Sequence, residues 1–161
     1  MISTEESVTS ALKRARAALR YRRAQSADPE PPPAGSARER ELVRRFTQAY
    51  EAGDVDKLVN LLTEDAWLIM PPVPMQYQGR ELAARFWGAT AFRSGRSARL
   101  VPTRSNGQPA FGLYVRESPG AAALGNGILV LTLAGSQISA VTGFPDQRAL
   151  RSFGLPPALP G

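Results

Sequence analysis

A proline-rich stretch near the N-terminus divides the chain in two. Residues 25–36, QSADPEPPPAGS, hold four prolines and no aliphatic residue larger than alanine. Proline lacks a backbone N–H and clashes with the preceding helical turn, so this stretch cannot continue a helix. We expect an extended linker over residues 25–37, in which twelve residues at polyproline pitch reach about 37 Å. The sequence therefore predicts a short N-terminal segment, residues 1–24, tethered to a globular domain.

The N-terminal segment is predicted to be a basic amphipathic helix. Ser3 and Glu6 have the spacing of a capping box, so we expect the helix to begin at Ser3 or Thr4. Apolar residues recur at helical spacing on one face, and polar and basic residues lie on the neighbouring flank. The apolar stripe is Val8, Ala11, Leu12, Ala15 and Leu19, flanked by Thr9, Lys13, Arg16 and Arg20. The stripe needs a partner to bury it, and we expect none from the few residues before it.

Most of the positive charge lies in this segment. The chain carries 20 Lys and Arg against 14 Asp and Glu, a net charge of +6. Residues 1–25 hold six of the basic residues against Glu5 and Glu6, which places +4 there. This concentration favours a polyanionic partner such as nucleic acid. Composition alone leaves a solvated Arg-rich helix open as the alternative.

The residue types that the chain lacks exclude several kinds of chemistry. There is no Cys, and hence no disulfide, zinc–thiolate site or thiol nucleophile. There is no His, the commonest metal ligand and general base. We expect no cofactor and no metal, because Glu64 and Asp65 are most simply a solvated pair. No apolar run is long enough for a membrane span and the start has no signal-peptide core, so we expect a cytoplasmic chain.

The part after the linker is predicted to be an α+β domain. Apolar residues have helical spacing in residues 42–50, 55–62 and 82–87, with Gly53 ending the first helix and Asp54 capping the second. Strand-like runs occupy residues 66–72, 98–104, 111–116, 128–133 and 137–144. Early helices followed by a run of hairpins favour an antiparallel sheet.

Two stretches of this domain resemble a known fold family. YEAGDVDKLVNLLTEDAWLIMPP, residues 50–72, and YQGRELAARFW, residues 77–87, are similar to the first half of the nuclear-transport-factor-2-like fold. More narrowly, they resemble the SnoaL-like polyketide cyclases, a group that includes ketosteroid isomerases. The resemblance implies a cone over residues 38–146, in which a curved antiparallel sheet wraps around helices and encloses an apolar pocket.

The flanking segments resemble a second family. SVTSALKRARAALR, residues 7–20, is similar to the second helix of the helix-turn-helix in region 4 of extracytoplasmic-function sigma factors. In a subset of these factors a Pro-rich linker leads into a SnoaL-like domain, and FGLPP at 153–157 resembles their tails. The resemblance implies the C-terminal part of such a factor, beginning inside the helix-turn-helix, with RNA polymerase core and promoter DNA as partners of the intact parent. The implied DNA contacts are Ser7, Thr9, Ser10, Lys13 and Arg14 at bases, with Arg16 and Arg20 at phosphates.

The resemblance to ketosteroid isomerases also allows their catalytic positions to be compared. Their helix Tyr, strand-end Asp and later-strand Asp correspond here to Phe46, Met70 and Leu129. Proton abstraction needs a positioned base and an oxyanion partner, so we expect no catalysis. Asp146 is the remaining carboxylate of the last strands, and we interpret it as a helix cap for the tail, residues 147–161.

Apolar side chains of the domain form a candidate pocket for a flat or greasy ligand. The predicted lining is Trp67, Met70, Met75, Tyr77, Phe86, Trp87 and Tyr114, and ordinary core is the alternative for each. We expect the apolar tail to fold back onto a groove, either of the domain or of absent sigma regions. Its large apolar residues are Leu150, Phe153, Leu155 and Leu159.

The sequence thus predicts a regulatory C-terminal domain of a sigma factor that acts within its own chain. A stand-alone SnoaL-like isomerase or cyclase with a hydrophobic substrate is the alternative from another class. The resemblance also leaves a homodimer through the sheet open.

Overall fold

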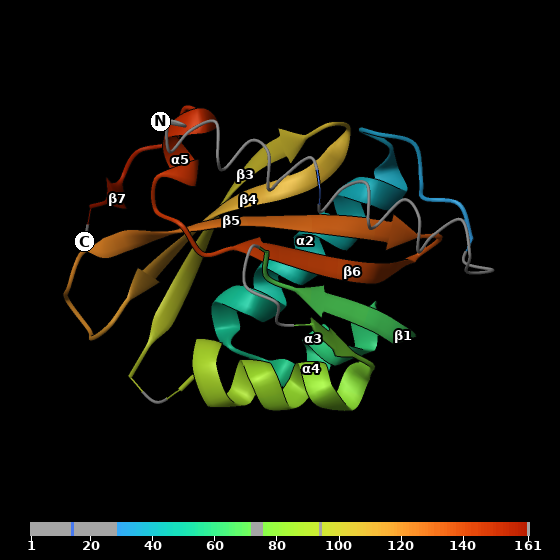
Figure 1. Ribbon diagram of the computed structural model, residues 1–161, viewed down its shortest axis with the longest axis horizontal. Helices are drawn as coiled ribbons and strands as arrows, with labels where there is room; N and C mark the ends of the chain where they lie inside the picture. The colour runs from blue at the N-terminus through green and yellow to red at the C-terminus, as the bar shows by residue number, and fades with distance from the viewer. Residues whose placement is uncertain (1–13, 15–28, 72–75, 94, 161) are drawn as a thin grey trace.

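A computed structural model describes residue 14 and residues 29–71, 76–93 and 95–160. Its elements in chain order are α2 (Ala37–Ala52), α3 (Val55–Leu61), β1 (Leu62–Ile69), β2 (Gln76–Gln78), α4 (Arg80–Phe86), the π-helix η1 (Trp87–Ala91), β3 (Ser97–Ser105), β4 (Gln108–Arg116), β5 (Ala123–Ala134), β6 (Gln137–Phe144), α5 (Ala149–Ser152) and β7 (Ala158–Leu159). Figure 1 shows a curved sheet with α3 and α4 beside its lower edge and α2 behind it. None of the helices in these described residues is long and apolar enough to cross a membrane.

Helix α2 is fixed at both ends by its own sequence. Its first turn is a capping box, in which Ser36 Oγ accepts from the N–H of Glu39 at 3.3 Å. In return, Glu39 Oε1 accepts from the N–H of Gly35 at 3.1 Å. The helix ends at Gly53, whose φ of 67° is the left-handed conformation that glycine adopts without strain. Asp54 then caps α3 through the N–H of Lys57, as the sequence predicts.

The strands form a seven-stranded sheet in the order β2-β1-β6-β5-β4-β3, with β7 paired to β5. The predicted α+β class and the curved sheet packed against helices are confirmed. The expectation of an antiparallel sheet is corrected at one place, because β1 and β6 run parallel. Helix α4 and η1 carry the chain to the far edge of the sheet before the meander β3–β6 returns, so β6 meets β1 in the same direction.

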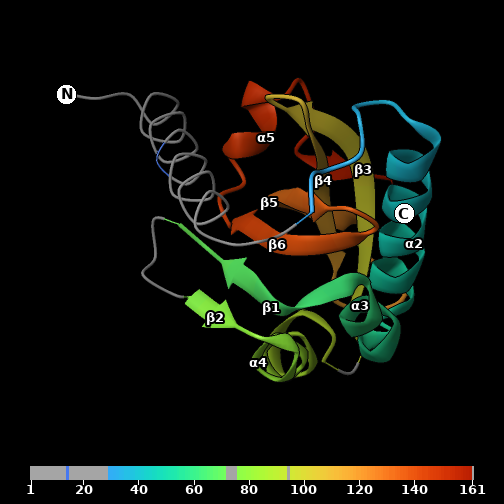
Figure 2. The ribbon, with the colours of Figure 1, turned by 90° about the vertical axis from the view of Figure 1, so that its right-hand side faces the viewer.

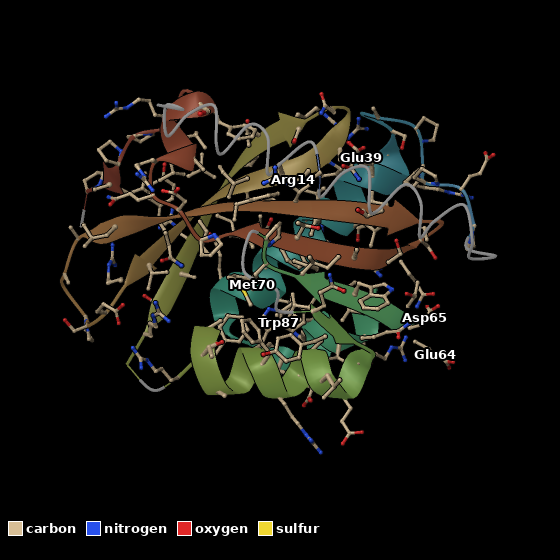
Figure 3. The ribbon with its side chains drawn as sticks, in the orientation of Figure 1. Arg14, Glu39, Glu64, Asp65, Met70 and Trp87 are labelled. Carbon is tan, nitrogen blue, oxygen red and sulfur yellow. The ribbon has the colours of Figure 1, made fainter. Side chains whose placement is uncertain are left out.

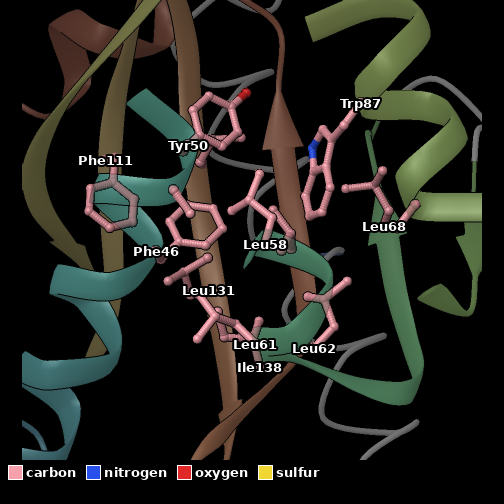
Figure 4. Packing of buried hydrophobic residues seen from close by; sticks show 14 of the residues in the cluster. Phe46, Tyr50, Leu58, Leu61, Leu62, Leu68, Trp87, Phe111, Leu131 and Ile138 are labelled. Atoms are coloured by element: carbon pink, nitrogen blue, oxygen red, sulfur yellow. The ribbon is translucent and has the colours of Figure 1, made fainter. Parts of the chain in front are cut away.

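The helices bury the inner face of the sheet in a large apolar core. Phe46 of α2 is fully buried and stacks on Phe111 of β4, with ring centroids 5.6 Å apart and planes at 20°. Leu58 of α3 and Trp87 of η1 belong to the same core. Figure 4 shows these side chains filling the space between α2, α3 and the strands. Burial of this apolar surface is the main stabilising contribution to the domain.

The C-terminal tail packs on the opposite, outer face of the sheet. Figure 2 shows α5 and α2 on opposite sides of β3 and β4. Leu150 of α5 is 1% exposed within a second core on this face. Strand β7 pairs antiparallel with the start of β5. The sequence left two locations for the tail, a groove of the domain or a groove of sigma regions. The structure places the tail on the domain.

Several predicted boundaries shift in the structure. The second helix ends at Leu61, and Leu62 already opens β1, which ends at Ile69. The third helix is longer than predicted, because α4 continues as η1 to Ala91. Strand β5 begins at Ala123, five residues earlier than predicted, and β2 has no counterpart in the predicted elements.

Candidate functional site

Four of the predicted pocket residues lie at or near the inner face of the sheet. Trp87 is 2% exposed within the main core. Tyr77 and Phe86 pack against this core, with their ring centroids 5.3 Å apart. Met70 follows β1 and is half-buried, and Figure 3 shows it with Trp87. A ligand pocket at these four residues stays a prediction, and Met75 lies outside the described residues.

The structure does not bring Trp67 and Tyr114 into this group. Trp67 packs in a small cluster with Ile69 and Ala140. Tyr114 is fully buried in the outer-face core, where its O–H donates to the carbonyl of Pro156 at 2.8 Å. Successive residues of a strand point to opposite faces, and that alternation separates these side chains from the inner core. Trp67 and Tyr114 therefore pack in other clusters than Tyr77, Phe86 and Trp87.

The three positions compared with the isomerases hold apolar side chains in apolar surroundings. Phe46 stacks on Phe111, and Leu129 is buried in the same core. An added Cβ on Gly143 would lie 3.4 Å from Leu129 Cδ2 and 3.5 Å from Met70 Cγ, so these two side chains flank the same point of β6. None of the three side chains can take up or donate a proton.

Asp146 is engaged in the turn that leads into α5. Its Oδ1 accepts from the backbone N–H of Arg148 at 2.9 Å and from Arg148 Nε at 3.0 Å. These hydrogen bonds and the guanidinium charge lower the pKa of Asp146 below its ordinary value of 3.8. The carboxylate therefore stabilises the turn before the helix, rather than the first turn of α5, and it stays ionised near neutral pH.

The acidic pair Glu64–Asp65 is exposed on β1. The register of β1 to β6 shifts between Leu62 and Trp67, and Figure 3 shows both carboxylates at the rim of the domain. Within the described ranges no group of three or more His, Cys, Asp or Glu residues could hold a metal ion.

The predicted DNA contacts fall almost entirely outside the described residues. Arg14 alone is described, and it is helical and exposed. Ser7, Thr9, Ser10, Lys13 and Arg16 lie outside those ranges, so their contacts with bases and phosphates stay predictions.

The sequence analysis expected the tail to fold back onto a groove, but it did not identify the two strand glycines that receive the tail. An added Cβ on Gly125 would lie 2.2 Å from Leu150 Cδ1, and one on Gly112 would lie 2.7 Å from Leu155 Cδ1. At Gly125 the added Cβ would also lie 2.8 Å from the backbone oxygen of Pro157, whereas at Gly112 it would meet only the ends of side chains. Gly125 also donates its N–H to the carbonyl of Pro157 at 2.8 Å. The signal was present in the sequence, because glycine inside a strand often marks a close approach of other groups.

Comparison with known proteins agrees with this fold. A family model described as a SnoaL-like domain matches residues 43–141. Among solved structures, an NTF2-like protein of unknown function from Mesorhizobium loti has a TM-score of 0.57 at 18% identity, over 71% of this chain and 96% of that chain. A candidate ketosteroid isomerase from Kribbella flavida has a TM-score of 0.56 at 19% identity, over 69% of this chain and 79% of that one. Structural similarity at 18–19% sequence identity shows a shared fold and does not show a shared function.

A closer match extends beyond the domain. The ECF RNA polymerase sigma factor SigG of Mycobacterium tuberculosis is 36% identical over 154 residues, which is 94% of this chain. The chain spans 40% of the length of that relative. The family match at residues 43–141 takes in more than half of the chain, and the chain therefore belongs to the family of SnoaL-like domains.

Proposed function

We propose that this chain is the C-terminal regulatory part of an alternative sigma factor, whose SnoaL-like domain modulates transcription initiation by the other regions of the same protein. The supporting observation is the extent of the match to SigG. That match takes in 94% of the chain, whereas the domain match takes in only residues 43–141. The relationship therefore includes most of the basic segment, the linker and the tail.

The described end of the linker is bonded to the domain. The N–H of Gly135, in the turn between β5 and β6, donates to the carbonyl of Glu30 at 2.8 Å. An added Cβ on Gly135 would also lie 3.2 Å from Pro29 Cβ, so the end of the linker lies against the domain. A domain carried in the same chain as the sigma regions would act on them at a high effective concentration.

We propose regulation without catalysis. The support is the apolar character of Phe46, Met70 and Leu129 and the engagement of Asp146 by Arg148. A stand-alone isomerase or cyclase remains the rival proposal. It would be favoured by turnover of a 5-ene-3-ketosteroid that is lost in Asp146→Asn, and we expect no turnover.

A chimera tests the regulatory role. The part of SigG that matches this chain is replaced by residues 1–161, and a second chimera carries residues 1–36 only. Both are compared in run-off transcription with purified M. tuberculosis core polymerase, on a promoter that SigG itself transcribes. We expect the two chimeras to differ in transcript yield at equal polymerase occupancy. Equal yields across the titration would contradict the proposal.

A further inference from the structure

We propose that a groove between α2 and β3 binds an amphipathic acid, a carboxylate attached to an apolar body. This α2–β3 groove has a cavity volume of about 600 Å³, within the range of small-molecule sites. Its lining comes from α2, β3 and β4: Glu39, Arg40, Val43, Arg44, Thr47, Gln48, Pro102, Thr103, Arg104, Pro109 and Ala110. It is separate from the core around Trp87, and the proposal does not depend on a role in transcription.

Two polar ties join α2 to β3, one at the groove and one beyond its end. At one end, the side chain of Arg104 pairs with the buried carboxylate of Glu39. At the other end, Glu51 Oε2 accepts from the N–H of Leu100 at 2.9 Å. The two glutamates are twelve residues apart on α2, which is about 18 Å along the helix axis. The part of α2 that lines the groove, from Glu39 to Gln48, lies between these two ties.

The floor between the two ties is apolar. It is formed by Val43 and Thr47 on α2 and by the proline rings of Pro102 and Pro109. Proline rings and a short β-branched side chain cannot rotate to fill the space. An apolar ligand body would gain free energy here in proportion to the area that it removes from water.

Two arginines at one end provide a site for a single anionic head. Arg40 Nη1 donates to the carbonyl of Gly35, and Arg104 uses its Nη1 for Gly107 and its Nη2 for Glu39. Within the described part of the chain these bonds leave Nε and Nη2 of Arg40, and Nε of Arg104, for a ligand carboxylate. Charge-assisted bonds of this kind are the stronger hydrogen bonds.

Neighbouring charges limit the ligand to one anionic group. Glu41 holds Arg44 in a bidentate pair at 2.6 and 2.9 Å and also accepts from Arg45 at 3.0 Å. Arg44 is therefore already neutralised. Glu39 lies between Arg40 and Arg104 and would repel a polyphosphate that extended along the groove. These contacts favour a monocarboxylate over nucleic acid.

The edge of β3 argues against a peptide strand as the occupant. Pro102 has no N–H, and the N–H of Leu100 is already bonded to Glu51. An added strand would need a row of free donors and acceptors along this edge. A ligand held by side chains and apolar contact fits the groove better.

The test uses the full chain, with octanoate as the probe in calorimetry and in NMR of the two methyl groups of Val43. We expect saturable binding that shifts both methyl signals and is weaker for octanamide, which has the same shape without the charge. Arg40→Ala should raise Kd about two- to fivefold, because it removes one exposed cation. Thr47→Trp, which fills the floor, should abolish binding.

Arg151→Ala is the matched control, because it removes one exposed positive charge on α5, outside the groove. It should leave Kd unchanged. Equal affinity for octanoate in the parent chain and in Thr47→Trp, or no saturable binding in the parent, would overturn the proposal. Shifts at Trp87 in place of Val43 would also overturn it, because they would place the ligand in the main core.

Discussion

The O–H of Tyr114 donates to the carbonyl oxygen of Pro156 across 2.8 Å, which bonds the middle of β4 to the C-terminal tail. Beside it, the N–H of Gly125 donates to the carbonyl of Pro157 at 2.8 Å. Proline has a backbone carbonyl that accepts hydrogen bonds but no N–H that donates them. The sheet supplies one donor to Pro156 and one to Pro157. The tail is therefore seated on the outer face by specific bonds as well as by the burial of Leu150.

Tyr114→Phe removes one of these bonds and keeps the ring in place. We expect a loss of about 1 kcal/mol in the free energy of unfolding, the usual net contribution of a hydrogen bond. For a domain of this size the midpoint should fall by about 3–5 °C in calorimetry. Tyr77→Phe, a half-buried tyrosine of β2, is the control and should shift the midpoint by less. Equal shifts in the two variants would contradict a specific role for the Tyr114 bond.

Gly125→Ala should displace the tail while the sheet remains folded. The new Cβ would lie 2.2 Å from Leu150 Cδ1 and 2.8 Å from the carbonyl oxygen of Pro157, and this backbone oxygen cannot move without the tail. Overpacking of this kind costs about 1–3 kcal/mol. Hydrogen exchange should become faster across residues 149–159 and stay slow in β4 and β6.

Gly88→Ala is the matched control for that experiment, because nothing lies within 4 Å of an added Cβ at Gly88. Its exchange pattern should equal that of the parent chain. Unchanged protection of the tail in Gly125→Ala would show that the close approach does not hold the tail in place.

Arg80→Lys should loosen the junction between α3 and β1. Arg80 donates from Nε and Nη2 to the carbonyl oxygen of Leu62, at 3.1 and 2.7 Å, and Gln137 Nε2 donates to the same oxygen at 3.2 Å. Lysine cannot reproduce the planar fork, so we expect a loss of about 1–3 kcal/mol in urea unfolding. Arg85→Lys, at an exposed i,i+4 pair with Glu81, should change stability by less than about 0.5 kcal/mol.

Asp146→Asn gives a prediction for pH dependence. Arg148 lowers the pKa of Asp146 in the folded chain below its ordinary value of 3.8. The carboxylate therefore stabilises the folded state above that value, and the contribution is lost as the pH falls through the folded pKa. The parent should be more stable than Asp146→Asn near pH 7, and the difference should shrink near pH 2. A difference that grows on acidification would contradict the assigned pairing with Arg148.

The helices of the domain were largely predictable, because their signals are local. Phe46 and Tyr50 follow the helical period, and Gly53 and Asp54 mark the junction of α2 and α3. Leu62 was assigned to a helix, because an apolar residue after Leu61 fits either the helix or the strand that follows. The sequence had no local signal to decide between them.

Pairings between distant segments could not be predicted in this way. The parallel contact of β1 with β6 depends on the path of the chain through α4. The separation of Tyr114 from the core around Trp87 depends on which face of β4 Tyr114 occupies, and a shift of one residue in register reverses the face. The α2–β3 groove depends on ion pairs such as Glu39 with Arg104, whose members are far apart in sequence.

The central claim, that the domain acts on sigma regions of its own chain, is tested most directly by run-off transcription from the two chimeras. The measurement is the ratio of transcript from the chimera with residues 1–161 to that from the chimera with residues 1–36, at equal polymerase occupancy. The account predicts a ratio different from one. The ratio should move toward one in Gly125→Ala, which displaces the tail from the sheet. A ratio of one throughout, with the domain folded, would contradict it.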